Sequence, residues 1–321
     1  MKDGAIGRGL LFLSQAEVTE LLDPDHLLES LAQGFIEASA GQTSVPPRVA
    51  ARTPVGMLAA MPGFIPSAGL VAKLVSVFPA NHGTQVPSHQ ALIALFDDRD
   101  GRALAVMDGT RITALRTAAA AALATRLLAR PEARNLAILG AGVQGSTHLE
   151  MLPRVRDFAE IRVASRNLEH AAALAALHPR ARAAETFEAA ARGADVVCCC
   201  TDSPDPVVDR AWLGVGAHVT SVGYSSSGAE LDPATVRAAR LFVESRDAFA
   251  PPPAGAVELA GLDPALGTEL GEVLSGVAPG RRDGIELTLY KSMGHALEDA
   301  VAARLVYDRA LAVGAGARLP V

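Results

Sequence analysis

The sequence predicts an α/β protein that combines a doubly wound parallel sheet with a separate α+β region before it. From residue 135 onward, short apolar runs alternate with helical segments, which is the order typical of parallel βαβ units. The run NLAILGAGVQG at 135–145 carries a glycine pattern that joins a strand to a helix. Before residue 110, strand-like runs instead follow one another with short turns between them, which favours antiparallel pairing.

The first region should open with the strand GLLFLS and two helices, over 17–22 and 24–40, the second ending at Gly41. In that second helix Leu27, Leu28, Leu31 and Phe35 recur at helical spacing. The expected strands then lie at 49–53, 56–61, 69–78, 90–96 and 103–108, with DDRDG as a turn. Residues 113–129 have the highest helix propensity of the chain, and Pro131 closes that helix.

The second region alternates strand and helix as far as residue 245. Its expected elements are the strand LAIL, a helix over 143–152, the strand IRVAS, a helix over 168–177, a short strand AAE at 183–185, a helix over 187–192, and the strands DVVCCC, HVTSVG and LFVES. The proline-rich segment 250–260 is expected to be a loop or hinge. A last strand and a long helix, which could pack back on the first region, end the pattern.

Composition limits the class of protein. With 321 residues the chain can form two domains, and a net charge of −6 without a long basic run argues against nucleic-acid binding. No apolar signal or membrane-spanning segment is evident, so a cytoplasmic location is expected. Cys198, Cys199 and Cys200 are adjacent and lack zinc-ligand spacing, which favours small buried residues of a central strand over metal or redox chemistry.

The glycine-rich run predicts a dinucleotide site. Gly140, Gly142 and Gly145 have the spacing G-x-G-x-x-G, which provides a tight turn, room for a pyrophosphate and close packing of helix on strand. A helix that starts at Val143 and Gln144 would direct backbone N–H groups at the phosphates. A tight turn without any ligand is the alternative interpretation.

The end of the next strand indicates which dinucleotide is bound. The acidic residue that would accept hydrogen bonds from a ribose 2′-hydroxyl is missing, and Ser165, Arg166 and Asn167 stand there instead. These side chains suit a 2′-phosphate, so NADP(H) is preferred over NAD(H), although a surface arginine can also be merely solvated. Thr201 and Val222, in or just after the next two strands, complete the expected cofactor contacts.

Three cations precede the dinucleotide motif. Arg48 follows two prolines, Lys73 interrupts the apolar run GLVAKLVSVF, and Arg116 stands near the predicted start of a helix. A lysine in such a strand must reach solvent or meet a partner, because burying an unpaired ammonium is costly. The three could bind a small carboxylate, and ordinary solvated charges are the alternative. His82 and His89 follow in a loop as weaker candidates for an acid or base, and no metal site is expected.

These residues together resemble the ornithine cyclodeaminase/mu-crystallin family. The likeness covers nearly the whole chain and rests on six motifs: PPR at 46–48, KLVSVFPAN at 73–81, SHQALIALFDDRDGRALAVMDG at 88–109, ITALRTAAAAALATRLLA at 112–129, ILGAGVQG at 138–145 and YKSMGHALEDAVAARLVYD at 290–308. It implies a Rossmann-like dinucleotide-binding domain over 117–294, inserted into a smaller α+β substrate and dimerisation domain over 1–116 that residues 295–321 complete. A homodimer is expected from the resemblance.

The resemblance also implies roles for particular residues. Arg48, Lys73 and Arg116 match the cations that bind the substrate carboxylate and form the active site, with Lys73 and Arg116 the expected catalytic residues. The segment containing Ser292, Met293 and Gly294 is placed near the nicotinamide. Members of the family interconvert amino and imino acids by hydride transfer, as cyclodeaminases, alanine dehydrogenases or reductases of cyclic ketimines.

One departure from the cyclodeaminase pattern favours a reductase. Ser225 stands where cyclodeaminases have an aspartate, and cyclodeamination needs a carboxylate base that a serine hydroxyl cannot replace. Ser225 then becomes a candidate for substrate binding. The sequence thus predicts NADPH-dependent reduction of the C=N bond of a small 2-imino acid, in particular a cyclic ketimine carboxylate. Three alternatives stay open: an alanine dehydrogenase, an ornithine or lysine cyclodeaminase, and a crystallin-like protein that binds NADP(H) without turnover.

Overall fold

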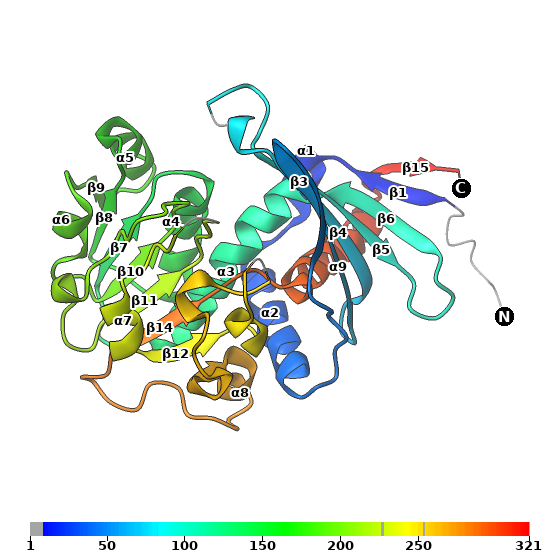
Figure 1. The fold of residues 1–321 in the computed structure, drawn as a ribbon. Helices are drawn as coiled ribbons and strands as arrows, with labels where there is room; N and C mark the ends of the chain where they lie inside the picture. Colours follow the sequence, from blue (N-terminus) through cyan, green and yellow to red (C-terminus); the bar gives the residue numbers. More distant parts are fainter. Residues whose placement is uncertain (1–8, 82, 226–227, 253, 321) are drawn as a thin grey trace. The chain divides into compact units, whose positions relative to one another are not determined.

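Two separate β-sheets organise the chain. The structure, a computed structural model, describes residues 9–81, 83–225, 228–252 and 254–320. Met1–Arg116 and His295–Val321 group into one unit, called unit 1, and Thr117–Gly294 form a second, called unit 2. Each unit contains one of the sheets (Figure 1).

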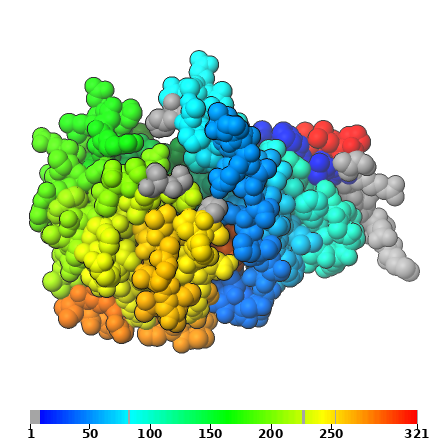
Figure 2. All heavy atoms as spheres, in the orientation of Figure 1, coloured from blue at the N-terminus to red at the C-terminus, as the bar shows by residue number. Residues whose placement is uncertain are grey.

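The sheet of unit 1 has the strand order β15-β1-β6-β5-β4-β3-β2. Its strands are β1 (Leu10–Leu13), β2 (Val49–Thr53), β3 (Gly56–Ile65), β4 (Gly69–Val77), β5 (His89–Phe96), β6 (Ala103–Asp108) and β15 (Ala317–Leu319). Neighbours pair antiparallel, as predicted, except that β1 and β6 run parallel. Strand β2 is exposed along its whole length and lies at the surface in the view of Figure 2.

Helices cover one face of this sheet. Helix α1 (Gln15–Leu21) and helix α2 (Pro24–Ser39) are capped by the side chains of Ser14 and Asp23. The predicted apolar face of α2 is buried, and helix α9 (Ala296–Val313) packs against α2 and against β3, β4 and β5. The C-terminal helix thus completes the core of unit 1 although it lies far away in the sequence.

Helix α3 (Thr110–Leu128) begins earlier than the predicted Thr113. The Asp108 carboxylate accepts hydrogen bonds from the backbone N–H groups of Thr110 at 3.0 Å and Arg111 at 3.3 Å, which fixes the first turn. Arg116 therefore lies in the second turn of the helix and not at its start, where the sequence placed it. The boundary between the two units falls directly after Arg116, inside this helix.

The sheet of unit 2 is parallel throughout and has the order β13-β12-β14-β11-β10-β7-β8-β9. Its strands are β7 (Asn135–Leu139), β8 (Glu160–Ala164), β9 (Ala181–Ala183), β10 (Val196–Cys199), β11 (His218–Ser221), β12 (Arg240–Val243), β13 (Gly267–Glu269) and β14 (Thr288–Lys291). The chain runs outward from β7 through β8 to β9 and then returns to β10 on the other side of β7. The strand order reverses there, which is where open α/β sheets bind their ligands, at the carboxyl ends of the strands.

Short helices connect these strands: α4 (Val143–Val155), α5 (Leu168–Ala175), α6 (Phe187–Ala191), α7 (Pro233–Ala238) and α8 (Leu270–Leu274). Strand β9 lies two residues before the predicted 183–185, because it pairs with residues 161–163 of β8. Thr186, just beyond it, caps α6 by accepting a hydrogen bond from the Ala189 N–H at 3.0 Å. The short elements α7, α8 and β13 were not predicted.

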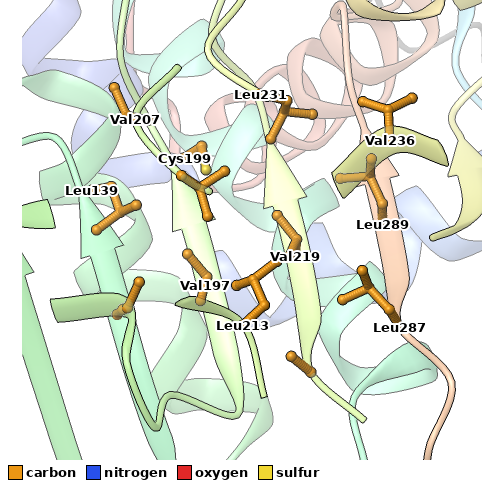
Figure 3. Close-up of a cluster of buried hydrophobic side chains, with 14 of the residues drawn as sticks. Leu139, Val197, Cys199, Val207, Leu213, Val219, Leu231, Val236, Leu287 and Leu289 are labelled. Atoms are coloured by element: carbon orange, nitrogen blue, oxygen red, sulfur yellow. The ribbon is translucent and has the colours of Figure 1, made fainter. Parts of the chain in front are cut away.

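The core of unit 2 lies on its central strands. Figure 3 shows Val197, Val219 and Leu289, which neighbour one another across β10, β11 and β14, together with Leu139 and Cys199. All three cysteines are buried, as the sequence predicted. Burial raises the pKa of the Cys198 thiol to about 12 and those of its two neighbours well above the ordinary value, so these thiols are structural.

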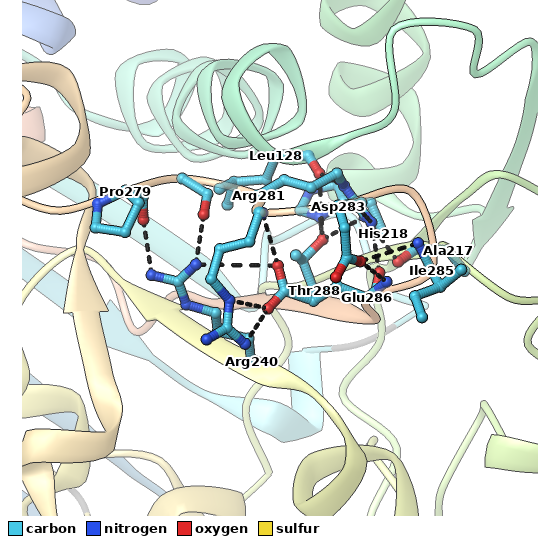
Figure 4. A network of polar contacts seen from close by, with 12 residues as sticks. Leu128, Ala217, His218, Arg240, Pro279, Arg281, Asp283, Ile285, Glu286 and Thr288 are labelled. Atoms are coloured by element: carbon cyan, nitrogen blue, oxygen red, sulfur yellow. Dashed lines mark hydrogen bonds and ion pairs between the residues drawn. The ribbon is translucent and has the colours of Figure 1, made fainter.

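A polar network closes the amino end of this sheet (Figure 4). The Arg281 guanidinium donates hydrogen bonds to the carbonyl of Leu128 at the end of α3, to the Ala217 carbonyl at 3.1 Å and to the Thr288 hydroxyl at 2.9 Å. The His218 ring lies 2.9 Å from the same hydroxyl. Because the network lies where β11 and β14 begin, it stabilises the fold at the edge opposite the expected ligand site.

Candidate functional site

The predicted dinucleotide turn joins β7 to α4 in unit 2. Gly140 has a φ of +119°, and a Cβ built there would lie 2.6 Å from the Cys200 carbonyl oxygen. A Cβ on Gly145 would lie 2.0 Å from the Gly140 oxygen. On Gly142, by contrast, a Cβ would meet no heavy atom of the described residues within 4 Å. The fold itself therefore requires Gly140 and Gly145, whereas Gly142 keeps a space open in front of the turn.

The same turn forms the start of α4. Gly142 is the N-cap residue, and no side chain in the described part of the chain caps the helix there. Val143, the first helical residue, is an exposed apolar side chain, with 67% of its surface accessible. An open space before an uncapped helix start suits a pyrophosphate, because the N–H groups of the first turn and the helix dipole both favour an anion.

The 2′-phosphate candidates follow β8 directly. Arg166 is exposed, and its guanidinium lies 3.8 Å from the carboxylate of Asp202, which is equally exposed. Asn167 has a structural role, since its side-chain oxygen caps α5 by accepting hydrogen bonds from the N–H groups of Glu169 and His170. Ser165 is half-buried and accepts a long hydrogen bond of 3.4 Å from the Asn167 N–H.

A buried carboxylate that sequence reasoning missed holds the loops at the carboxyl edge of the sheet. Glu230 accepts hydrogen bonds from the Thr201 N–H and hydroxyl, from the Ser221 hydroxyl at 2.7 Å and from the Gly223 N–H at 2.7 Å. Thr201, a predicted cofactor contact, is thus engaged by Glu230 through both its N–H and its hydroxyl. Val222 is fixed next to it by a hydrogen bond from its N–H to the Cys199 carbonyl.

Lys291, at the end of β14, is the cation of this network. Its ammonium donates hydrogen bonds to the Ser221 hydroxyl at 2.9 Å and the Gly223 carbonyl at 2.7 Å, and it pairs with the Glu258 carboxylate at 3.2 Å. It is 1% exposed. The sequence could have pointed to Lys291, because a lysine that ends the apolar strand TLYK must find partners when it is buried.

The segment after β14 is held by its backbone. The Ser292 N–H donates to the Ser221 carbonyl, the Met293 N–H donates to the Glu244 carboxylate at 2.7 Å, and the Gly294 N–H donates to the Ser292 hydroxyl. This segment and the loop of Ser225 follow neighbouring strands, β14 and β11, at the same edge. Ser225 is half-buried, and Ser226 and Ser227 lie outside the described residues.

Unit 1 brings two of the three predicted cations together. The Lys73 ammonium on β4 lies 2.6 Å from one carboxylate oxygen of Asp299 in α9, and the Arg116 guanidinium donates to the other at 3.1 Å. Arg116 also donates to Glu298 at 2.6 Å. Every member of this group, called the ion cluster, is at most 4% exposed. The partner that the buried lysine required is therefore Asp299.

Burial and neighbouring charges oppose each other in the ion cluster. Burial lowers the pKa of Lys73 to about 8, and the charge of Arg116 acts in the same direction, while Asp299 and Glu298 raise it. Burial alone would raise the pKa of Asp299, but Arg116 and Lys73 outweigh it and lower that pKa. At neutral pH the cluster therefore contains an ionised aspartate and a lysine whose proton is held less tightly than usual.

Arg48 lies just before β2. Val49 pairs with Ala60, and Met61 pairs with Lys73, so continuing this register by one residue places Arg48 opposite Met61 on the row that carries Lys73. Residues on one row of a sheet point to the same face, and two strand spacings correspond to about 10 Å. Arg48 is half-buried.

His89, one of the two histidine candidates, is not brought to the ion cluster. His89 begins β5, four residues before Ile93, which pairs with Lys73. Four strand residues span about 13 Å. His89 is exposed and its ring lies 3.2 Å from the Ser88 hydroxyl. His82 lies outside the described residues.

Neither a metal centre nor a membrane-spanning helix is found in the part of the chain that the structure describes. Among the residues that the structure describes, no three His, Cys, Asp or Glu side chains gather in a way that could hold a metal ion. Nor is any helix in the described ranges long and apolar enough to cross a membrane.

The parallel sheet with its glycine turn, in a chain whose other unit carries a buried ion cluster, is typical of NAD(P)-dependent oxidoreductases that act on small molecules. Within that class the chain belongs to the ornithine cyclodeaminase/mu-crystallin family, whose sequence profile matches residues 9–314. The resemblance identified from the motifs is confirmed.

Relatives with known activities match over almost their full length. The chain is 40% identical to the ketimine reductase mu-crystallin of Mus musculus over 312 residues, which covers 94% of this chain and 97% of that one. It is 31% identical to the alanine dehydrogenase of Archaeoglobus fulgidus, covering 96% and 98%. Among solved structures, the Δ1-pyrroline-2-carboxylate reductase of Thermococcus litoralis, in complex with NADH and L-proline, superposes with a TM-score of 0.90 at 33% identity and covers 97% of this chain and 100% of that one.

Proposed function

We propose that this protein uses NADPH to reduce the carbon–nitrogen double bond of a small 2-imino acid, with a cyclic ketimine carboxylate as the preferred substrate. The ion cluster of unit 1 is the observation that carries the proposal, because it presents a buried ammonium of lowered pKa beside a guanidinium. The ketimine and pyrroline-carboxylate reductases among its relatives support the same reaction.

Charge within unit 1 favours a substrate with one carboxylate. Lys73 and Arg116 carry two positive charges, and Glu298 and Asp299 carry two negative ones, so the ion cluster is neutral. Arg48, on the same row of the sheet as Lys73, adds one positive charge. We assign the main carboxylate contact to Arg48 and a second one to Arg116, since a guanidinium binds a carboxylate through two parallel hydrogen bonds.

Lys73 would act on the nitrogen of the substrate. NADPH supplies the hydride when it is bound. The Lys73 ammonium donates a proton to the imine nitrogen, so that the product is the amine, and the resulting neutral lysine takes its next proton from solvent. A pKa of about 8 suits this role, because the ammonium is then mostly protonated at neutral pH yet releases its proton readily.

Unit 2 would bind the cofactor. Gly142 and the first turn of α4 would hold the pyrophosphate, and Ser165 and Arg166 the 2′-phosphate. The preference for NADP(H) rests on the missing acidic residue at the end of β8 and on the accessible guanidinium of Arg166. Ser225 and the segment Ser292 to Gly294, which follow neighbouring strands, are assigned to the nicotinamide half.

The lyase alternative lacks its base. Ser225 replaces the aspartate of cyclodeaminases, and the buried carboxylate nearest to it in sequence, Glu230, already accepts four hydrogen bonds. These four hydrogen bonds hold the Glu230 carboxylate within the fold as a structural group. The alanine dehydrogenase relative keeps amino-acid dehydrogenation as the second candidate.

The exposed face of the unit 1 sheet is proposed as a homodimer interface. Leu74 on β4 and Leu92 on β5 are directly paired, and 44% and 51% of their surfaces are accessible. Leu74 follows Lys73, so it points to the face opposite the ion cluster. Apolar side chains paired on an open sheet face mark an interaction surface, and an archaeal alanine dehydrogenase of similar fold, 29% identical with a TM-score of 0.89, is a dimer with bound NAD.

A substrate panel tests the proposed function. The purified protein is mixed with NADPH or NADH and with a five-membered cyclic imino acid, a six-membered one, or pyruvate plus ammonia, and loss of reduced cofactor is followed. Turnover of the cyclic imino acids with NADPH is expected. Reduction of pyruvate only in the presence of ammonia would replace the proposal with the dehydrogenase, and tight cofactor binding without turnover would favour a binding protein.

Variants of Arg48 and Arg52 test the carboxylate contact. Arg48→Met should raise KM roughly tenfold or more, the scale of a lost hydrogen bond between charged groups. Arg52→Met is the matched control, because Arg52 lies on β2, four residues along the chain from Arg48 and away from the row of Lys73. Equal KM values for the two variants would contradict the role of Arg48.

A further inference from the structure

Two adjacent acids in the first turn of α9 have different partners. Glu298 contacts Arg116 at 2.6 Å, whereas Asp299 bridges Arg116 at 3.1 Å and Lys73 at 2.6 Å. Both carboxylates are fully buried. Sequence reasoning did not single them out, and their neighbours Leu297, Ala300 and Val301 belong to the buried core. Two charges at such positions are retained only where they are paired.

We propose that Glu298 and Asp299 are positioning residues with separate tasks: Asp299 orients the Lys73 ammonium as the proton donor, and Glu298 fixes the Arg116 guanidinium that contacts the substrate carboxylate. This inference rests on the proposed function and adds to it. Neither acid is assigned a contact with the substrate.

The protonated form of Lys73 depends on the negative charge of Asp299, because burial and the charge of Arg116 disfavour it. Met61 on β3 and Ile93 on β5 flank it in the sheet and are apolar. The charged groups that face it come from α3, which contributes Arg116, and from α9, which contributes Glu298 and Asp299. Arg48 adds a second cation on the same row of the sheet. Without the charge of Asp299, two cations and the low polarity of the site would both disfavour the protonated lysine.

The position of Glu298 and Asp299 on α9 supports the separate tasks proposed for them. Helix α9 begins at Ala296, so both acids lie in its first turn, where the helix dipole stabilises negative charge. The helix dipole thus acts in the same direction as Arg116 and Lys73, which lower the pKa of Asp299, and the helix directs Asp299 at β4. During reduction the imine carbon gains the hydride and the imine nitrogen gains the Lys73 proton. Asp299 stays ionised throughout and stabilises the ammonium before transfer and again after reprotonation.

Two isosteric variants test the proposal, Asp299→Asn and Glu298→Gln, with kcat/KM measured from pH 6 to 9.5. In the wild type, kcat/KM should fall above the pKa of Lys73, and this fall is called the alkaline limb of the pH profile. Asp299→Asn should move the alkaline limb to lower pH by about 1 to 3 units, the usual effect of one adjacent opposite charge. Glu298→Gln should leave the limb within about 0.5 unit of its original pH and raise KM roughly tenfold.

A limb that stays in place in Asp299→Asn, or one that moves equally in both variants, would overturn the division of tasks. Asp299→Glu restores the charge and should bring the limb back toward its original pH, which separates an electrostatic effect from a loss of folding. Calorimetric binding of L-proline without cofactor provides a readout that does not need turnover. Its pH dependence should shift in Asp299→Asn only, and absence of that shift would count against the proposal even if the substrate panel gave no turnover.

Discussion

Replacement of Gly142 by alanine should abolish tight cofactor binding without unfolding the protein. Gly142 has φ −87° and ψ −161°, a conformation that alanine adopts without strain, and a Cβ there meets no heavy atom of the described residues within 4 Å. The change in unfolding free energy should stay within about 1 kcal/mol, because the loss of a glycine N-cap and the reduced entropy of the unfolded chain oppose each other. A shift in Tm of no more than about 4 °C is therefore expected.

The added methyl group would occupy the space assigned to the pyrophosphate. Displacing a phosphate oxygen from backbone N–H groups removes one or two hydrogen bonds to a charged group, each worth about 1.5 to 3 kcal/mol. The Kd for NADPH should accordingly rise at least about tenfold, measured by titration of nucleotide fluorescence. Gly214→Ala is the matched control, since its Cβ also meets no heavy atom of the described residues and Gly214 lies away from the turn.

Gly145→Ala should differ from Gly142→Ala in its effect on stability. Its Cβ would lie 2.0 Å from the Gly140 oxygen, so this variant should lose stability as well as affinity. If Gly142→Ala bound NADPH with the wild-type Kd, the pyrophosphate could not rest on this glycine. The assignment of the turn as the cofactor site would then be refuted.

Three further predictions concern the cofactor, pH and assembly. Arg166→Ala should weaken NADPH binding about tenfold and leave NADH binding unchanged, and an equal loss for both cofactors would rule out a 2′-phosphate contact. Burial lowers the pKa of His148 to about 4, and burial together with Arg281 lowers that of His218 to about 3, from an ordinary 6.5. The unfolded chain therefore binds more protons below pH 6.5, so these histidines stabilise the fold above that pH and stability falls as the pH drops. The loss should be about 4 kcal/mol between pH 7 and 5 in urea titrations, with about half of it absent in His218→Asn. A variant that kept the full loss would show that the proton uptake occurs elsewhere. Finally, Leu74→Glu combined with Leu92→Glu should convert a dimer into a folded monomer in light scattering, and a dimer that survives both changes must use another surface.

The fold was largely predictable because most of its helices and strands have recognisable local sequence patterns. The alternation of strands and helices predicted the parallel sheet of unit 2, and the succession of strands with short turns predicted the mostly antiparallel sheet of unit 1. The place of β14 between β11 and β12 was not predictable, because nothing in its own residues indicates which neighbours it pairs with. The pairing of β15 with β1 is a similar case, since it joins the two ends of the chain. Such pairings depend on tertiary packing rather than on local pattern.

The same distinction holds for the candidate site: residues set by local backbone constraints were predictable, and those set by tertiary packing were not. Glycine spacing pointed to Gly140, Gly142 and Gly145 because a turn constrains backbone conformation within a few residues. The buried lysine of β4 implied a partner, but its identity as Asp299 required a helix more than two hundred residues later to pack on the sheet. Glu230 was missed for the same reason, because its donors come from two separate loops. Sequence indicates which charges need partners, and only the fold shows which residues supply them.

According to the proposed function, this protein transfers a hydride to an imine carbon and consumes its cofactor. The most direct measurement uses NADPH with deuterium at both positions of the nicotinamide C4 and a cyclic 2-imino acid, followed by mass spectrometry and NMR of the product. One deuterium at C2 of a cyclic amino acid is expected for each NADP⁺ formed. Conversion of ornithine to proline and ammonia without net oxidation of the cofactor would contradict it.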